Sequence, residues 1–188
     1  MKRTLLPAIA LSAALALTGC SGSAEPGQDT AAGEHAGHGD ADVMFAQMMI
    51  PHHEQAIEMA DAVLARPDAD PRVAELAGQV KAAQAPEIET LTGWLDTWGA
   101  EPTGDHGGHA GMDGMMSDED LQALAAATGP AADRLFLEQM IVHHEGAVEM
   151  AQAQVEDGQD AGAVEMAQTI VDTQAAEIET MEELLASM

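Results

Sequence analysis

The chain contains no tyrosine, one cysteine, two phenylalanines, two tryptophans and only six lysines and arginines in 188 residues. With 33 acidic residues against those six basic ones, it lacks the positive charge that phosphate contacts require, which excludes nucleic acid as a partner. A single cysteine excludes an intramolecular disulfide and a site built from several thiolates. Because aromatic residues are scarce, the core must come from Ala, Leu, Ile, Val and the 13 methionines, whose thioethers are also the main source of sulfur ligands.

The one cysteine ends a segment that is typical of an export signal. Lys2 and Arg3 precede an apolar run from Leu5 to Leu17, which is too short to span a membrane as a stable helix. The tetrad Leu-Thr-Gly-Cys resembles a lipobox, which implies cleavage before Cys20 and lipidation of this residue. We therefore expect residues 1–19 to be a lipoprotein signal peptide and the mature protein to be anchored by Cys20 to the outer face of the cell membrane. The alternative is a free, buried cysteine in an uncleaved apolar helix.

The rest of the chain is dominated by an internal repeat. Residues 42–60, DVMFAQMMIPHHEQAIEMA, return at residues 133–151 as DRLFLEQMIVHHEGAVEMA, with 11 of 19 positions identical. Residues 74–95 match residues 164–185 at 9 of 22 positions. Each copy therefore contains two segments with helical periodicity, and a hairpin of two amphipathic helices cannot bury its apolar face alone.

This duplication predicts an all-α four-helix bundle made of two αα-hairpins over residues 42–188. The first hairpin spans residues 42–98 and the second spans residues 131–188. Residues 99–130 form a long crossover rich in Gly, His and Met, with a short helix near its end. Residues 20–41 are rich in Gly, Ala and Ser and are expected to form a flexible tether.

Acidic and hydroxyl residues mark the expected helix starts. Asp70, followed by Pro71, is expected to cap the second long helix, and Asp160 the last one. Ser117 with Asp120 resembles a capping box for the short helix. The first helix is expected to start at Asp40 or Asp42, and its counterpart at Pro130 or Asp133.

One face of the repeated helix carries side chains suited to a soft metal ion. Adjacent imidazoles and thioethers lie on the stripe that a bundle would bury, at spacings of four and seven residues. Thioether and imidazole together suit Cu(I), and imidazole also accepts Cu(II). The alternative is that Met fills gaps in the core while His makes hydrogen bonds. The candidate ligands are Met49, His52, His53 and Met59 in the first copy and Met140, His143, His144 and Met150 in the second.

Polar residues of the partner helix repeat as well. Gln84 and Gln174 fall on the buried face, with Glu87 and Glu177 at its border. Each of the four is a candidate acceptor that fixes an imidazole tautomer beside a metal, or a direct ligand. A plain surface role for the two glutamates is the alternative.

The crossover holds a second candidate site. His106, His109, Met112, Met115 and Met116 lie within eleven residues, with Gly between them, and could wrap a copper ion by ordering around it. The alternative is a flexible linker in which these residues are incidental.

The motifs MIPHHEQAIEMA and MIVHHEGAVEMA, each followed by a helix with QAxEIET, closely resemble the duplicated signature of the DUF305 family, named for a domain of unknown function. The resemblance covers Asp42 to Leu185. It implies a ferritin-like helical bundle in an exported protein. For some members it also implies copper binding and copper tolerance in the periplasm, with His and Met as ligands.

We therefore expect an exported lipoprotein that binds copper, or another transition metal, and acts in copper buffering, tolerance or hand-over. Its expected partners are metal ions and, through Cys20, the membrane. The enzyme alternative is a ferritin-like metal-dependent oxidoreductase, but its Glu-x-x-His motif occurs nowhere in the sequence. A further alternative is a structural or interaction lipoprotein in which the His pairs form a hydrogen-bond network.

Overall fold

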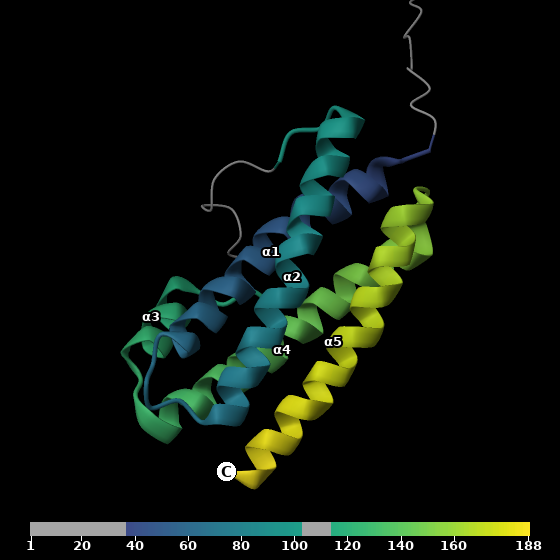
Figure 1. Cartoon of the computed structure of the whole chain (residues 1–188). Coiled ribbons are helices and arrows are strands. Elements are labelled where there is room, and N and C mark those ends of the chain that lie inside the picture. The colour runs from purple at the N-terminus through teal and green to yellow at the C-terminus, as the bar shows by residue number, and fades with distance from the viewer. Residues whose placement is uncertain (1–36, 103–113) are drawn as a thin grey trace, which may run out of the picture. The chain divides into compact units, whose positions relative to one another are not determined.

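The computed structural model describes residues 37–102 and 114–188 (Figure 1). The helices are α1 (Asp40–Leu64), α2 (Pro71–Trp98), α3 (Asp118–Ala126), α4 (Gly129–Asp157) and α5 (Ala161–Ser187). Contacts divide the chain into residues 1–34 and 35–188, and all five helices belong to the second unit. The described residues form no strand, so the all-α prediction is confirmed. None of these helices is long and apolar enough to cross a membrane.

Side-chain caps form at three of the predicted helix starts. The Asp70 carboxylate accepts a backbone hydrogen bond at the start of α2, where Pro71 needs no hydrogen-bond partner of its own. Ser117 and Asp120 make the reciprocal bonds of a capping box at α3. Asp160 accepts two backbone hydrogen bonds at the start of α5. The predicted starts of these three helices are therefore confirmed.

The two hairpins of the repeat are α1 with α2 and α4 with α5, and α1 and α4 make the main contact between them (Figure 1). The start of α1 lies at the end of α4, because Gln154 Nε2 donates to Asp42. The chain just after α1 lies near the start of α4, because Arg66 Nη2 donates to Asp133. The two repeated helices therefore run antiparallel.

Two clusters of buried apolar side chains fill the bundle. The α3-side cluster includes Met59, Phe136 and Met140, and is completed by Leu124 of α3. The Trp-side cluster, against which Trp94 and Trp98 pack, includes Phe45 and Met49. Met, Leu, Val and Ala supply most of both clusters, as the shortage of aromatic residues predicts.

Asp42 ties the start of α1 to the turn between α4 and α5. The carboxylate is fully buried and accepts hydrogen bonds from Gln154 Nε2 and from the backbone N–H groups of Gly39, Gln159 and Asp160. Burial alone would raise the pKa of Asp42, but these hydrogen bonds outweigh burial and hold the pKa below 3.8. Asp42 is thus a clasp between the hairpins.

Asp133 is the repeat equivalent of Asp42 and makes the corresponding clasp at the other end. Its carboxylate accepts hydrogen bonds from Arg66 Nη2 at 2.8 Å and from the backbone N–H of Asp70 at 3.1 Å. Of the expected starts of the two repeated helices, Asp40 is confirmed for α1, and α4 begins at Gly129, one residue before Pro130. The alternatives Asp42 and Asp133 lie two and four residues inside these helices, where each carboxylate reaches the opposite hairpin.

Candidate metal centre

All four histidines of the repeated pairs are fully buried. His52 and His143 meet across the interface between α1 and α4, with ring centroids 3.7 Å apart and ring planes tilted by 39°. Along each helix the pair stands between residues of the α3-side and Trp-side clusters. The two repeats therefore build one layer of imidazoles, here called the histidine layer, in the middle of the bundle.

The second histidine of each pair is held by a glutamate from the other helix of its own hairpin. His53 Nε2 lies 2.7 Å from Glu87 Oε2, and His144 Nε2 lies 2.8 Å from Glu177 Oε2. An ionised carboxylate only accepts hydrogen bonds, so Nε2 of each ring carries the proton. In the neutral ring the lone pair is then on Nδ1.

Within the described part of the chain, neither Nδ1 of His53 nor Nδ1 of His144 has a hydrogen-bond partner. A buried acceptor without a partner costs about 1–3 kcal/mol. An imidazole whose N–H is held by a carboxylate, while its other nitrogen points into a buried site, is the usual arrangement of a metal ligand. The geometry of Glu87 and Glu177 thus fits the predicted role of tautomer-fixing acceptors.

Burial is also the main reason that the pKa of His143 lies well below 6.5. Electrostatic repulsion from His52, His144 and His53 lowers it further. A histidine must be neutral to bind a metal, because protonation occupies the lone pair. His143 is therefore kept in the ligand-competent form at neutral pH.

The candidate methionines lie on both sides of the histidine layer. Met49 and Met140 are fully buried, and each precedes the second histidine of its pair by four residues, one turn of helix. Met59 is buried in the α3-side cluster with Met140. Met150 is only partly buried and packs against the Trp-side cluster, which contains Met49. Each cluster therefore receives one candidate thioether from each repeat.

Gln84 and Gln174 are buried, as the helical pattern predicts, with exposed fractions of 2% and 3%. In the described residues, both amide atoms of Gln84 and the Oε1 of Gln174 have no hydrogen-bond partner. By contrast, Glu54 and Glu145, which adjoin the His pairs in sequence, are exposed. The buried polar side chains thus include the two amides as well as the four imidazoles.

The end of the crossover is docked next to the histidine layer. Gln55 Nε2 donates to the Met116 carbonyl at 2.9 Å, and the Met116 N–H donates to Gln55 Oε1 at 2.7 Å. Gly114 has φ 84°, and a Cβ there would lie 2.8 Å from the Cα of Gly146. Only glycine fits so close an approach to α4. Met115 is half-buried in the same segment. No pattern in the sequence indicated the role of Gln55.

Three candidates of the crossover, His106, His109 and Met112, lie outside the described residues, as does Cys20. Within the described ranges, no three His, Cys, Asp or Glu side chains converge as a metal site. The His52 and His143 rings pack against each other, so they do not point at one shared ion in this conformation. The other buried donor groups described above are thioethers and amides.

Comparison with known proteins gives a family and a set of solved relatives. A DUF305 profile, for a domain of unknown function, matches residues 42–185. No curated protein matches the chain. A DUF305 fragment from Deinococcus radiodurans is 32% identical, with a TM-score of 0.75 over 81% of this chain and 100% of its own. A DUF305 protein from Streptomyces coelicolor, described as a candidate secreted protein, is 34% identical, with a TM-score of 0.73 over 78% of this chain and 93% of its own.

A metal-bound protein is among the similar structures. CopM in its Cu(I)-bound form is 31% identical, with a TM-score of 0.67 over 78% of this chain and 96% of its own. CopM has also been solved with Cu(II) and with Ag bound. The solved relatives share the all-α fold described above, and the profile spans both repeats. The chain belongs to the DUF305 family.

Proposed function

We propose that this chain is an extracytoplasmic copper-binding protein whose principal site lies at the histidine layer. The observation that carries the proposal is the pair of buried imidazoles, His53 and His144, each with Nε2 held by a glutamate and Nδ1 without a partner among the described residues. The copper- and silver-bound CopM structures support the choice of ion.

The available donors favour Cu(I) over harder ions. Met49 and Met140 each lie one helical turn from a histidine whose Nδ1 has no partner in the described part of the chain, and thioether with imidazole is a soft ligand set. Met59 and Met150 supply further thioethers at the edges of the layer, and Gln84 and Gln174 supply buried amides. Copper is the cargo of such a site, held away from solvent.

Buffering, tolerance or hand-over of copper is the proposed role. The docked segment with Met115 and Met116 lies beside the histidine layer, so ions captured on the crossover would be released close to the buried site. His106, His109 and Met112 would complete that outer capture site. Lipidation of Cys20 and removal of residues 1–19 would keep the protein at the membrane surface.

The methionines provide a test that leaves the fold nearly intact. Met→Leu removes the thioether but conserves volume, and such changes usually cost less than about 1.5 kcal/mol of stability. In the test variant, leucine replaces Met49, Met59, Met140 and Met150. We expect its affinity for Cu(I), measured by competition titration of the chain from Ser21 onward, to be lower than that of the wild type by about tenfold or more. This is about 1.4 kcal/mol or more of binding free energy.

Met44 and Met188 supply the matched control, because they are 58% and 41% exposed. Their replacement by leucine is expected to leave Cu(I) affinity unchanged. Unchanged affinity in the four-Met variant, with loss of affinity after alanine replacement of His106, His109 and Met112, would move the principal site to the crossover.

A structural role for the histidine layer is the second candidate, favoured by the packing of His52 on His143. In that case the His52–His143 contact stabilises the interface between the hairpins, and each glutamate ties a histidine to the other helix of its own hairpin. Thermal unfolding distinguishes the two roles, since an ion that binds only the folded state raises the melting temperature. A melting temperature unaffected by Cu(I) would favour the structural role.

A further inference from the structure

A hollow of about 280 Å³ opens between α2 and α5. Two of its residues, Glu87 and Trp94, are seven positions apart and therefore share one face of α2. The opposite wall is one face of α5. That wall consists of Gly162, Glu165, Met166 and Thr169.

The hollow is connected to the histidine layer through one side chain. Glu87 lines it and is 20% exposed, yet its Oε2 accepts the hydrogen bond from the fully buried His53 at 2.7 Å. A cation held against Glu87 would thus be one side chain away from the imidazole whose Nδ1 has no partner in the described structure.

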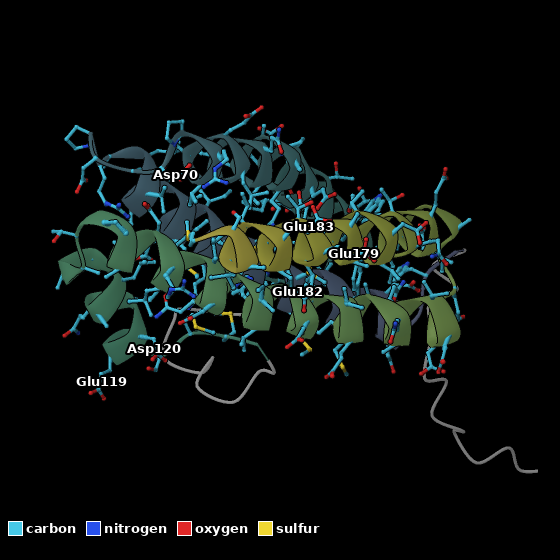
Figure 2. The ribbon with its side chains drawn as sticks, turned by 90° about the horizontal axis from the view of Figure 1, so that it is seen from below. Asp70, Glu119, Asp120, Glu179, Glu182 and Glu183 are labelled. Atoms are coloured by element: carbon cyan, nitrogen blue, oxygen red, sulfur yellow. The ribbon has the colours of Figure 1, made fainter. Side chains whose placement is uncertain are left out.

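The lining suits a soft monovalent cation. Met166 offers a thioether, which prefers Cu(I) or Ag(I) to Mg²⁺ or Ca²⁺. Trp94 offers an indole face, the strongest of the aromatic partners for a cation. The carboxylates of Glu87 and Glu165 add negative charge. Outside the hollow, α5 also carries the exposed Glu179, Glu182 and Glu183 (Figure 2), and such a field concentrates cations at the surface.

The position on the bundle that the repeat makes equivalent to the hollow lacks this combination. At the equivalent positions, Arg72 replaces Gly162, Leu76 replaces Met166 and Leu184 replaces Trp94. The Arg72 guanidinium donates to Asp70 and to Ser187 Oγ, so a fixed positive charge occupies that end. Both positions therefore have the glutamate that accepts a hydrogen bond from a buried histidine, but the thioether and the indole occur together at only one of them.

We propose that the hollow formed by Glu87, Trp94, Glu165 and Met166 is a docking site for Cu(I), from which the ion passes to His53. This rests on the proposed function and adds the side of the bundle at which the buried site is loaded. Glu87 acts in two ways: its carboxylate attracts the ion, and its Oε2 holds the imidazole of His53, which receives the ion.

Tryptophan emission gives a direct test, because the chain has only two tryptophans and Trp94 lines the hollow. The Trp98→Phe variant of the chain from Ser21 onward leaves Trp94 as the single emitter. Mixing it with Ag(I), or with Cu(I) without oxygen, is expected to quench Trp94 in a fast phase that precedes loading of the buried site. Equilibrium affinity is measured separately by competition titration.

Two variants borrow residues from the other half of the repeat. Met166→Leu is expected to abolish the fast phase and to slow loading about tenfold, with equilibrium affinity changed less than about twofold. Gly162→Arg places a positive charge in the hollow and is expected to do the same. Its added Cβ lies 3.2 Å from Asp160 Oδ1 and 3.3 Å from the Trp94 ring, so circular dichroism must first show that it folds. Met188→Leu, on the exposed C-terminal residue, is the control and should load at the unchanged rate.

Each outcome separates the docking site from the copper-binding function. Normal equilibrium affinity without quenching of Trp94, or with an unchanged loading rate in Met166→Leu, would overturn the docking site alone. Quenching of Trp94 without tight binding would also overturn it as a route to His53, and would count against the buried site. Loss of the fast quenching phase together with slower loading in both variants would establish the route.

Discussion

Replacing Asp42 by alanine is expected to lower the free energy of unfolding by about 3 kcal/mol or more. The carboxylate is fully buried and accepts hydrogen bonds from four donors, among them Nε2 of Gln154, a residue that is only 2% exposed. Alanine leaves these donors without an acceptor at the junction of α1 with the α4–α5 turn. Urea unfolding at pH 7, read from the transition midpoint and slope, measures the loss.

Asp61 provides the matched control, because its ion pair with Lys81, at 2.6 Å, is exposed on both sides. Asp61→Ala should change the free energy of unfolding by less than about 1 kcal/mol. The pKa of Asp42 is lowered in the folded state, so its contribution is present above about pH 4 and is lost as the pH falls through the folded value. The difference between the wild type and Asp42→Ala should therefore shrink in acid. If both substitutions lower the free energy of unfolding at pH 7 by the same small amount, Asp42 does not hold the two hairpins together.

Replacing His53 and His144 together by glutamine is expected to lower Cu(I) affinity about a hundredfold or more, since two ligands are lost. The glutamine amide can still donate to Glu87 or Glu177, so the glutamates keep a partner while the imidazole Nδ1 is removed. Competition titration gives the affinity. Circular dichroism and the urea midpoint confirm that the bundle stays folded.

His38 supplies the control for the loss of imidazole as such. It lies before α1, where its ring stacks on Trp98 at a centroid distance of 5.0 Å, away from the histidine layer. His38→Gln is expected to leave the affinity for Cu(I) unchanged. If the double variant binds Cu(I) as tightly as the wild type, His53 and His144 are structural residues and the ion binds elsewhere.

The fold could be predicted from the sequence because its signals are local and doubled. Asp70 with Pro71 and Ser117 with Asp120 mark helix starts through contacts within three residues, which periodicity and capping rules describe directly. The burial of His52, His53 and their repeat equivalents followed from their position on the apolar face. Two copies of one pattern also made the pairing of hairpins a natural expectation.

What the sequence could not supply were contacts between distant segments. Asp42 and Gln154 are 112 residues apart, and nothing local distinguishes Asp42 from an ordinary helix-capping aspartate. Glu87 was a candidate, but its bond to His53 depends on how two helices are rotated against each other. The hollow at Trp94 appears only when α2 and α5 are placed together, and the docking of Met116 on Gln55 likewise depends on the path of the crossover.

The most direct measurement is a crystal structure of the chain from Ser21 onward, loaded with Ag(I), with an anomalous difference map at a wavelength where silver scatters. The proposed site predicts a peak inside the bundle between α1 and α4, within bonding distance of Nδ1 of His53 or His144 and of a methionine sulfur. Silver found only on the crossover or at the surface, with the histidine layer unchanged, would contradict a buried copper site.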